Sequence, residues 1–239
     1  MGNSQSVRAC LETVAAADPA IGGLIAKEAA RQHSTIELIA SENHVSAAVM
    51  AAMGTCLTNK YAEGYPDARY YQGCGFHDGI ESIAIDRAKQ LFGVKHANVQ
   101  PHSGAQANQA MMQAVLEPGD TFASLLLKDG GHLSHGMKIN FSGRFFKPVH
   151  YPLHYEASHP EFERVNFEET RKVCLEAKPK IIMVGYSAYP RTIEFAKFRA
   201  IADECGALLV ADIAHIAGLV ASGEHPSPFP HAHIATTTT

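Results

Sequence analysis

The sequence carries little charge and no long uninterrupted hydrophobic run, and both shortages exclude whole classes of protein. Charged residues make up 18% of the 239 residues, against about 25% in an average soluble domain. The net charge is −4, so the chain lacks the excess of Lys and Arg that nucleic-acid-binding modules carry. Disorder is excluded because 46% of the residues are hydrophobic and disordered chains have low hydrophobicity. We therefore expect a folded protein with a full core and no nucleic-acid partner.

A membrane segment is not expected either. The most apolar stretch, residues 207–223, contains Asp212 and His215, whereas a spanning helix needs about 20 residues with few charges. The N-terminus lacks the apolar run of a secretory signal. The five cysteines form no Cys-x-x-Cys pair, which is typical of a reduced chain with free thiols. The sequence therefore predicts a cytoplasmic protein.

Helical and strand-like segments alternate along the chain. Apolar residues at helical spacing predict helices that begin at Asp18 and Asn166 and helices that end at Gly93 and Gly206. Continuous apolar runs predict buried strands at residues 97–100, 121–127, 180–184 and 207–211. This alternation indicates an α/β fold with a parallel sheet and helices on both faces. In such a fold the ligand lies beyond the carboxyl ends of the strands.

Ser103 and Gly104 follow the first expected strand and open an Ala-rich helical segment. The start of a helix offers free N–H groups and a positive dipole end, so this turn could bind a phosphate. An ordinary helix cap would use the same residues, and both interpretations stay open. A nucleotide P-loop is excluded because no Gly-Lys-Ser/Thr follows. The dinucleotide fingerprint fails because Asp78 occupies the place of its third glycine.

Asp212 follows the expected strand 207–211, and His215 comes three residues later. A buried carboxylate needs a partner, and the protonated ring nitrogen of a cofactor would serve. In pyridoxal phosphate enzymes such an acid keeps the pyridinium protonated. A helix cap at Asp212 is the alternative.

His132 lies between glycines in residues 129–136, after another expected strand. This framing leaves space for a flat ligand on which the imidazole could stack, although a lone histidine is more often structural. A metal is also conceivable, because His135 shares the segment and the chain holds 14 histidines. We expect no metal, since no His-Glu-x-x-His or Cys/His cluster is present.

Residues 61–71 concentrate four of the eight tyrosines around one acid, Glu63. Tyrosine combines an apolar body with a polar tip and is common at interfaces. The segment could therefore serve a neighbouring subunit, or it could be a packing loop.

Taken together, these segments resemble the serine hydroxymethyltransferase family, whose members are fold-type I pyridoxal phosphate enzymes. The resemblance covers nearly all of the chain beyond about residue 30, and the number and order of the motifs make it specific. The matching stretches are residues 37–43, 59–66, 69–71, 101–104, 130–133, 212–215 and 230–239.

The resemblance implies which residues hold the cofactor, pyridoxal 5'-phosphate. Ser103 and Gly104 would hold its phosphate, which Tyr61 would reach from the partner subunit. Asp212 would pair with the pyridine nitrogen, and His132 would stack on the ring. Three further residues complete the implied set: His215 near the phenolic oxygen of the ring, Ser187 near its polar edge, and Thr238 among the catalytic residues.

The resemblance also implies the substrates, serine or glycine and tetrahydrofolate. Ser41 would contact the substrate carboxylate, Tyr71 would position the amino acid, and Glu63 would act as acid and base across a homodimer with shared active sites. The residues implied to contact the folate are Leu127, Gly131, His132 and Leu133. The hydroxymethyl carbon of serine would pass to tetrahydrofolate, giving glycine and 5,10-methylenetetrahydrofolate for one-carbon metabolism and amino-acid biosynthesis.

Two departures from the family pattern stand out. Ala105 replaces the second hydroxyl of a Ser-Gly-Ser phosphate loop. The chain stops at Thr239, whereas in the family a His-Lys pair comes next and its lysine binds the cofactor as a Schiff base. We expect an N-terminal helical arm at residues 1–35 and a truncated large domain at 36–239, with a mostly parallel sheet of the seven-stranded type and without the small C-terminal domain.

The chain alone is thus expected to be an inactive fragment of a transferase. Two alternatives stay open. One is a folate-independent aldolase acting on β-hydroxy amino acids, and the other is a non-catalytic fragment.

Overall fold

The computed structural model describes residues 5–39 and 41–238, and the chain forms two compact units, Met1–Ala84 and Ile85–Thr239. Ala40 and Thr239, which belong to two of the motifs quoted above, lie outside the described residues.

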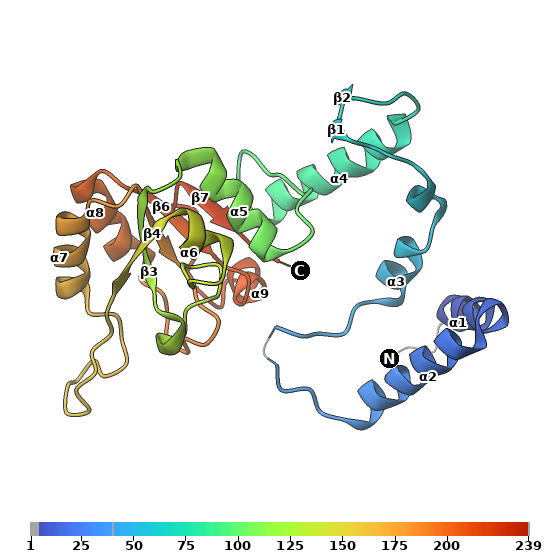
Figure 1. The fold of residues 1–239 in the computed structure, drawn as a ribbon, viewed down its shortest axis with the longest axis horizontal. Coiled ribbons are helices and arrows are strands. Elements are labelled where there is room, and N and C mark those ends of the chain that lie inside the picture. Colours follow the sequence, from blue (N-terminus) through green and yellow to red (C-terminus); the bar gives the residue numbers. More distant parts are fainter. Residues whose placement is uncertain (1–4, 40, 239) are drawn as a thin grey trace. The chain divides into compact units, whose positions relative to one another are not determined.

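The first unit consists of short helices joined by extended segments (Figure 1). Its elements are α1 (Gln5–Ala17), α2 (Pro19–Ser34), α3 (Ala47–Met53), a 3-10 turn (Cys56–Asn59), the strands β1 (Gly64–Tyr65) and β2 (Ala68–Arg69), and the start of α4 (Gly75–Phe92). Asp18 caps α2 as expected, because its side chain accepts hydrogen bonds from the N–H groups of Ala20 and Ile21. A short antiparallel hairpin joins β1 to β2.

The second unit is built on a parallel sheet of five strands in the order β4-β3-β5-β6-β7. The strands are β3 (Thr121–Leu125), β4 (Lys147–Tyr151), β5 (Ile181–Val184), β6 (Leu208–Asp212) and β7 (Ile234–Thr236). Every neighbouring pair in this sheet is parallel. The expected α/β fold is confirmed, and β3, β5 and β6 correspond to three of the four predicted strands.

The fourth predicted strand, residues 97–100, is wrong. These residues form no strand in the structure, because none of the described strands pairs with them. Two strands of the structure, β4 and β7, have no continuous apolar run that would predict them. β4 is an edge strand with mostly half-exposed side chains, of which only Tyr151 is buried, and β7 is three residues long among histidines and threonines.

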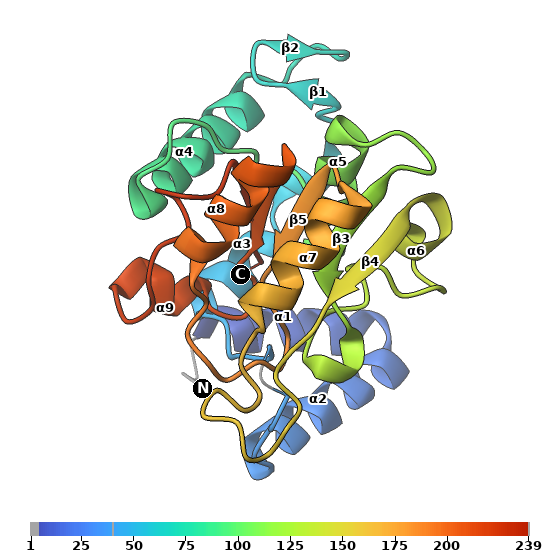
Figure 2. The same cartoon turned by 90° about the vertical axis from the view of Figure 1, so that its left-hand side faces the viewer.

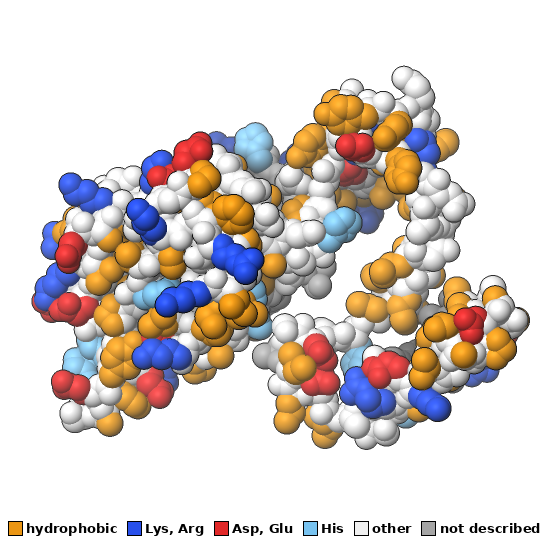
Figure 3. Space-filling model, viewed as in Figure 1, with side chains coloured by type: hydrophobic (Ala, Val, Ile, Leu, Met, Phe, Trp, Pro, Cys, Tyr) orange, Lys and Arg blue, Asp and Glu red, His pale blue; other side chains and the backbone are white. Residues whose placement is uncertain are grey.

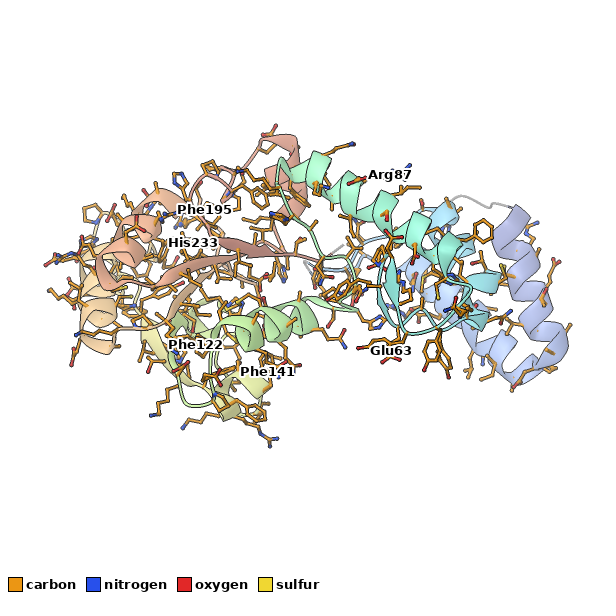
Figure 4. All side chains as sticks on the ribbon, turned by 90° about the horizontal axis from the view of Figure 1, so that it is seen from above. Glu63, Arg87, Phe122, Phe141, Phe195 and His233 are labelled. Atoms are coloured by element: carbon orange, nitrogen blue, oxygen red, sulfur yellow. The ribbon has the colours of Figure 1, made fainter. Side chains whose placement is uncertain are left out.

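Helices cover both faces of the sheet. They are α5 (Gly104–Val115), α6 (Phe141–Phe145), α7 (Phe167–Ala177), α8 (Phe195–Cys205) and α9 (Ala217–Ser222). Successive residues of β5 alternate between two core clusters: Ile182 packs with α7 and α8, which lie side by side in Figure 2, and Ile181 packs with α5. Figure 4 labels Phe195 of the first cluster and Phe122 of the second.

The predicted helix ends of this unit are confirmed. The side chain of Asn166 accepts a hydrogen bond from the N–H of Glu169 at the start of α7. Gly206 ends α8 in the left-handed conformation, and Gly93, with φ +66°, follows α4. Among the described helices, none combines the length and the apolar character that a membrane crossing requires.

Candidate functional site

The strand order creates a switch point at the carboxyl ends of β3 and β5. The chain runs from β3 to β4 on one side of β3 and then returns to place β5 on the other side. In open α/β sheets, ligands bind at such a point. Here the segments after the two strands meet, because the carbonyl of Gly130 accepts hydrogen bonds from the N–H groups of Ser187 (2.8 Å) and Ala188 (3.1 Å).

Asp212 lies at the end of β6 and is 8% exposed. Its Oδ2 accepts hydrogen bonds of 2.8 Å from Asn108 Nδ2 and from His135 Nε2. Its Oδ1 accepts a bond of 3.1 Å from the N–H of Ala214. Gly185 allows this close arrangement, since a Cβ at that position would lie 1.7 Å from the backbone oxygen of Asp212. The carboxylate is therefore fixed from three directions.

These donors keep Asp212 ionised. Burial alone would raise the pKa of the Asp212 carboxyl, but the hydrogen bonds from His135 and Asn108 outweigh it and hold the pKa below its usual value. Burial, together with the charge of His135, lowers the pKa of His132. The site thus combines a buried anion with a neutral imidazole at neutral pH.

Asn108 connects the site to α5 and to β7. Its Nδ2 also donates to Ser134 Oγ (2.9 Å), and its Oδ1 accepts a bond of 2.6 Å from the hydroxyl of Thr236. Ser103 caps the same helix, accepting a hydrogen bond of 3.2 Å from the N–H of Gln106. Five residues of helix correspond to about 7.5 Å along its axis. The start of α5 therefore lies about one and a half turns from the residue that holds Asp212.

His132, His135 and Asp212 form the one group of candidate metal ligands found among the described residues, with ligand atoms within 4.8 Å of one another. The 2.8 Å separation between His135 and Asp212 is that of a direct hydrogen bond. His132 Nδ1 lies 2.7 Å from Ser134 Oγ, and the rings of His132 and His135 meet edge to face with centroids 5.5 Å apart. His135 and Asp212 are thus joined by a direct hydrogen bond, and His132 is held beside them by Ser134.

The remaining candidates of the second unit lie around these groups. His215 is half-buried, and its charge contributes to the pKa of His132. Gly104 faces Thr238, because a Cβ on Gly104 would lie 2.6 Å from Thr238 Cγ2. The hydroxyl-bearing Ser187 is partly exposed. The three candidates that belong only to the folate group follow β3, with both leucines exposed and the glycine buried: Leu127, Gly131 and Leu133.

The other four candidates belong to the first unit. The side chains of Ser41, Tyr61, Glu63 and Tyr71 are exposed. The rings of Tyr61 and Tyr71 have centroids 6.0 Å apart, so these two lie together. Glu63, labelled in Figure 4, lies two residues from Tyr61 on the same segment.

Sequence reasoning missed four residues that build the site: Asn108, Ser134, His135 as a partner of Asp212, and Thr236. Asn108 offered a signal, since a polar residue in an Ala-rich helix, five positions after its cap, lies near the start of that helix. Ser134 and Thr236 gave none, because their hydroxyl groups are unremarkable until the fold brings them to Asn108.

The parallel sheet, its switch point and the buried carboxylate at a strand end define an α/β protein of the doubly wound type with a polar site at the strand ends. The sequence model described as "Serine hydroxymethyltransferase" matches residues 14–239. This chain belongs to the serine hydroxymethyltransferase family.

Three of the curated relatives that this chain matches are named serine hydroxymethyltransferase. The chain is 57% identical to that of Synechococcus sp. strain JA-3-3Ab and 56% identical to that of Microcystis aeruginosa strain NIES-843, over 229 residues in both. It is 58% identical to that of Nostoc sp. strain PCC 7120 over 222 residues. The matches cover 96%, 96% and 93% of this chain but 52%, 52% and 51% of the relatives. The chain thus spans about half the length of these relatives.

Proposed function

We propose that the protein of which these 239 residues form a part transfers the hydroxymethyl carbon of serine to tetrahydrofolate, with pyridoxal 5'-phosphate as cofactor. The observation that carries the proposal is the carboxylate of Asp212, buried at a strand end and kept ionised by its neighbours. A carboxylate offers about four acceptor positions, and three are in use. The donor set therefore fits one further N–H group, as a protonated pyridine nitrogen would supply.

The start of α5 would hold the phosphate. Ser103 begins this twelve-residue helix, and the first N–H groups of a helix have no partner within it. Gly104 carries no side chain and leaves the backbone accessible. Ala105 offers no hydroxyl, so backbone groups carry more of the binding. Tyr61 of a partner subunit would complete the phosphate contacts.

Around the ring, His132 would stack on one face as a neutral imidazole. His215 and Ser187 would contact its polar edge, and Thr238, beside Gly104, would belong to the catalytic residues. The bound group would supply an electron sink for the amino acid's Cα. Asp212 would hold the proton on the ring nitrogen on which this electron sink depends.

The first unit supplies the groups that handle the substrate. Ser41 binds its carboxylate, and Tyr71 orients it. Glu63 moves the proton of the serine hydroxyl as the hydroxymethyl carbon leaves. On the other substrate, Leu127 and Leu133 flank the folate beside Gly131, with His132 between them. The exposure of both leucines supports an apolar contact of this kind.

We assign the first unit to the contact between two subunits of a homodimer. Cys74 is the one buried hydrophobic residue that its described part contains, while large hydrophobic side chains over α2, α3 and the start of α4 are exposed (Figure 3). Apolar surface on this scale marks a protein interface. Within this arrangement, residues 1–35 form an arm and 36–239 belong to the cofactor-binding domain of a cytoplasmic enzyme.

The test uses protein purified from the natural gene. Bound cofactor should give a visible absorbance band that borohydride fixes to a lysine, and serine cleavage should require tetrahydrofolate. Cleavage without any folate dependence would favour the folate-independent aldolase. Absence of both the absorbance and the cleavage would refute the proposal and favour a non-catalytic fragment.

A further inference from the structure

Arg69 holds the backbone around Glu63 from within the first unit. We propose that Arg69 is a positioning residue, which aims the carboxylate of Glu63 through that backbone. The inference rests on the acid and base role proposed above for Glu63. It adds a residue that touches neither substrate nor cofactor but decides whether Glu63 is in place.

The guanidinium of Arg69 binds the two carbonyl groups that flank Glu63. Its Nη1 donates to the oxygen of Ala62 at 2.7 Å and to the oxygen of Gly64 at 2.8 Å. The carbonyl of Glu63 itself accepts a hydrogen bond of 3.1 Å from the N–H of Tyr70. Three successive carbonyl groups are therefore fixed, and with them the direction in which the Glu63 side chain leaves the chain.

The same guanidinium is anchored on α4. Its Nε donates to Asp78 Oδ1 at 2.7 Å, and its Nη2 donates to Glu81 Oε2 at 2.6 Å. These two acids lie three positions apart on the helix and so share one face. The side chain of Arg69 is only 5% exposed. The side chain of Arg69 therefore fixes the backbone on both sides of Glu63 relative to α4.

The loop needs this support because its own pairing is weak. β1 and β2 pair over two residues each, and an isolated hairpin is marginal in water even at greater length. Gly64 has φ +100°, and a Cβ there would lie 2.3 Å from the oxygen of Ala68, so only glycine allows the hairpin to close. The Cys74 sulfur lies 3.5 Å from the oxygen of Tyr61 and adds one weak contact.

Lysine cannot replace arginine here. Arginine presents five N–H donors in a planar fork. Arg69 makes four hydrogen bonds, two to backbone carbonyls and two to carboxylates on α4. Lysine carries one compact charge that cannot serve two carbonyls and two carboxylates together. Arg69→Lys therefore keeps the charge and removes the fork.

The decisive experiment is a double-mutant cycle on folate-dependent serine cleavage by protein from the natural gene. Arg69→Lys should lower kcat about 10- to 100-fold and leave KM for serine within about three-fold of the original value, because cofactor and substrate contacts stay in place. In a Glu63→Gln background the same substitution should cause no further loss, since its only route of action is gone. Equal losses in both backgrounds would overturn the inference.

A second measurement does not depend on activity. Amide hydrogen exchange at Tyr70, whose N–H is bonded to Glu63, should become about ten-fold faster in Arg69→Lys. Arg171→Lys is the matched control, because Arg171 forms an exposed ion pair with Glu204, and it should change neither readout. If the unaltered protein cleaves no serine, the proposed function fails while the exchange result still decides the positioning role. Unchanged exchange at Tyr70 would refute that role.

Discussion

The two units differ in where they put their hydrophobic side chains. The second unit buries them in two clusters on either side of a parallel sheet. The first unit leaves them exposed and holds its hairpin with one buried arginine. The polar site at the strand ends thus belongs to a unit with its own core, whereas the tyrosine-rich segment belongs to a unit whose described part buries few apolar side chains. The two units therefore differ in how much apolar packing stabilises them.

The largest difference should appear in catalysis. Asp212→Ala in the second unit is expected to lower kcat by about 10²–10³-fold, because the ring nitrogen of the proposed cofactor would lose its anionic partner, while phosphate binding would persist. Tyr61→Phe in the first unit should only weaken cofactor binding about ten-fold, as one hydrogen bond to a charged group is lost. Steady-state rates and cofactor titration measure both. Full turnover by Asp212→Ala would remove the role assigned to that residue.

Matched phenylalanines test the difference in packing. Phe198 is 0% exposed and lies between the rings of Tyr151 and Phe167, with centroids 5.3 and 5.0 Å away. Phe198→Ala should cost about 3–5 kcal/mol of unfolding free energy. Phe76 is 89% exposed, so Phe76→Ala should cost less than about 0.5 kcal/mol in dilute solution.

The two substitutions are compared by denaturant unfolding at low and at high protein concentration. A loss of unfolding free energy for Phe76→Ala that appears only at high protein concentration would show that Phe76 is buried between associated chains. A large loss at every concentration would show that the first unit has its own core and does not differ from the second unit in this respect.

Acid should act on the second unit through Asp212. Its pKa is depressed in the folded protein, so the stability that it contributes is complete above its unfolded pKa of about 4 and is lost as pH falls through the folded value. His135→Leu removes a donor, raises the pKa of Asp212 and should move the loss of thermal stability to higher pH. The measurement is Tm between pH 3 and pH 7. The double variant with Asp212→Asn serves as control and should abolish the shift.

The smallest expected effect concerns helix caps. Asn166→Ala removes the cap of α7, which packs on the core, and should cost about 1 kcal/mol of global stability. Ser46 caps α3 in the same way, through a bond from the N–H of Val49, but no residue of α3 is buried. Ser46→Ala should leave global unfolding unchanged in a denaturant titration. Equal losses at the two caps would mean that both units unfold as one.

The parts of the fold that could be predicted are those in which one local signal determines the outcome. The caps at Asp18 and Asn166 and the buried runs of β5 and β6 are of this kind, because hydrogen bonding and burial act within a few residues. Residues 97–100 misled because an apolar run becomes a strand only when another strand pairs with it. β7 is stabilised by pairing with β6, and its own three residues do not predict that pairing.

For the candidate site, the sequence identified single residues better than their partners. Asp212 is recognisable as an acid that follows an apolar run. Its dependence on Asn108 and His135 is not, because those contacts cross 104 and 77 positions of the chain. The roles assigned to Ser103, His132 and Glu63 stay predictions, and the substitutions above test them.

Asn108 carries a consequence for how the protein is made. Its amide joins residues that follow it by 26, 104 and 128 positions, so the growing chain must release Thr236 from the ribosome before the amide is satisfied. Contacts of such long separation are slow to form, because the entropy of closing the intervening loop opposes them. A nascent chain can assemble much of its sheet before that moment, but the hydrogen bonds of the Asn108 amide are complete only when β7 docks beside β6.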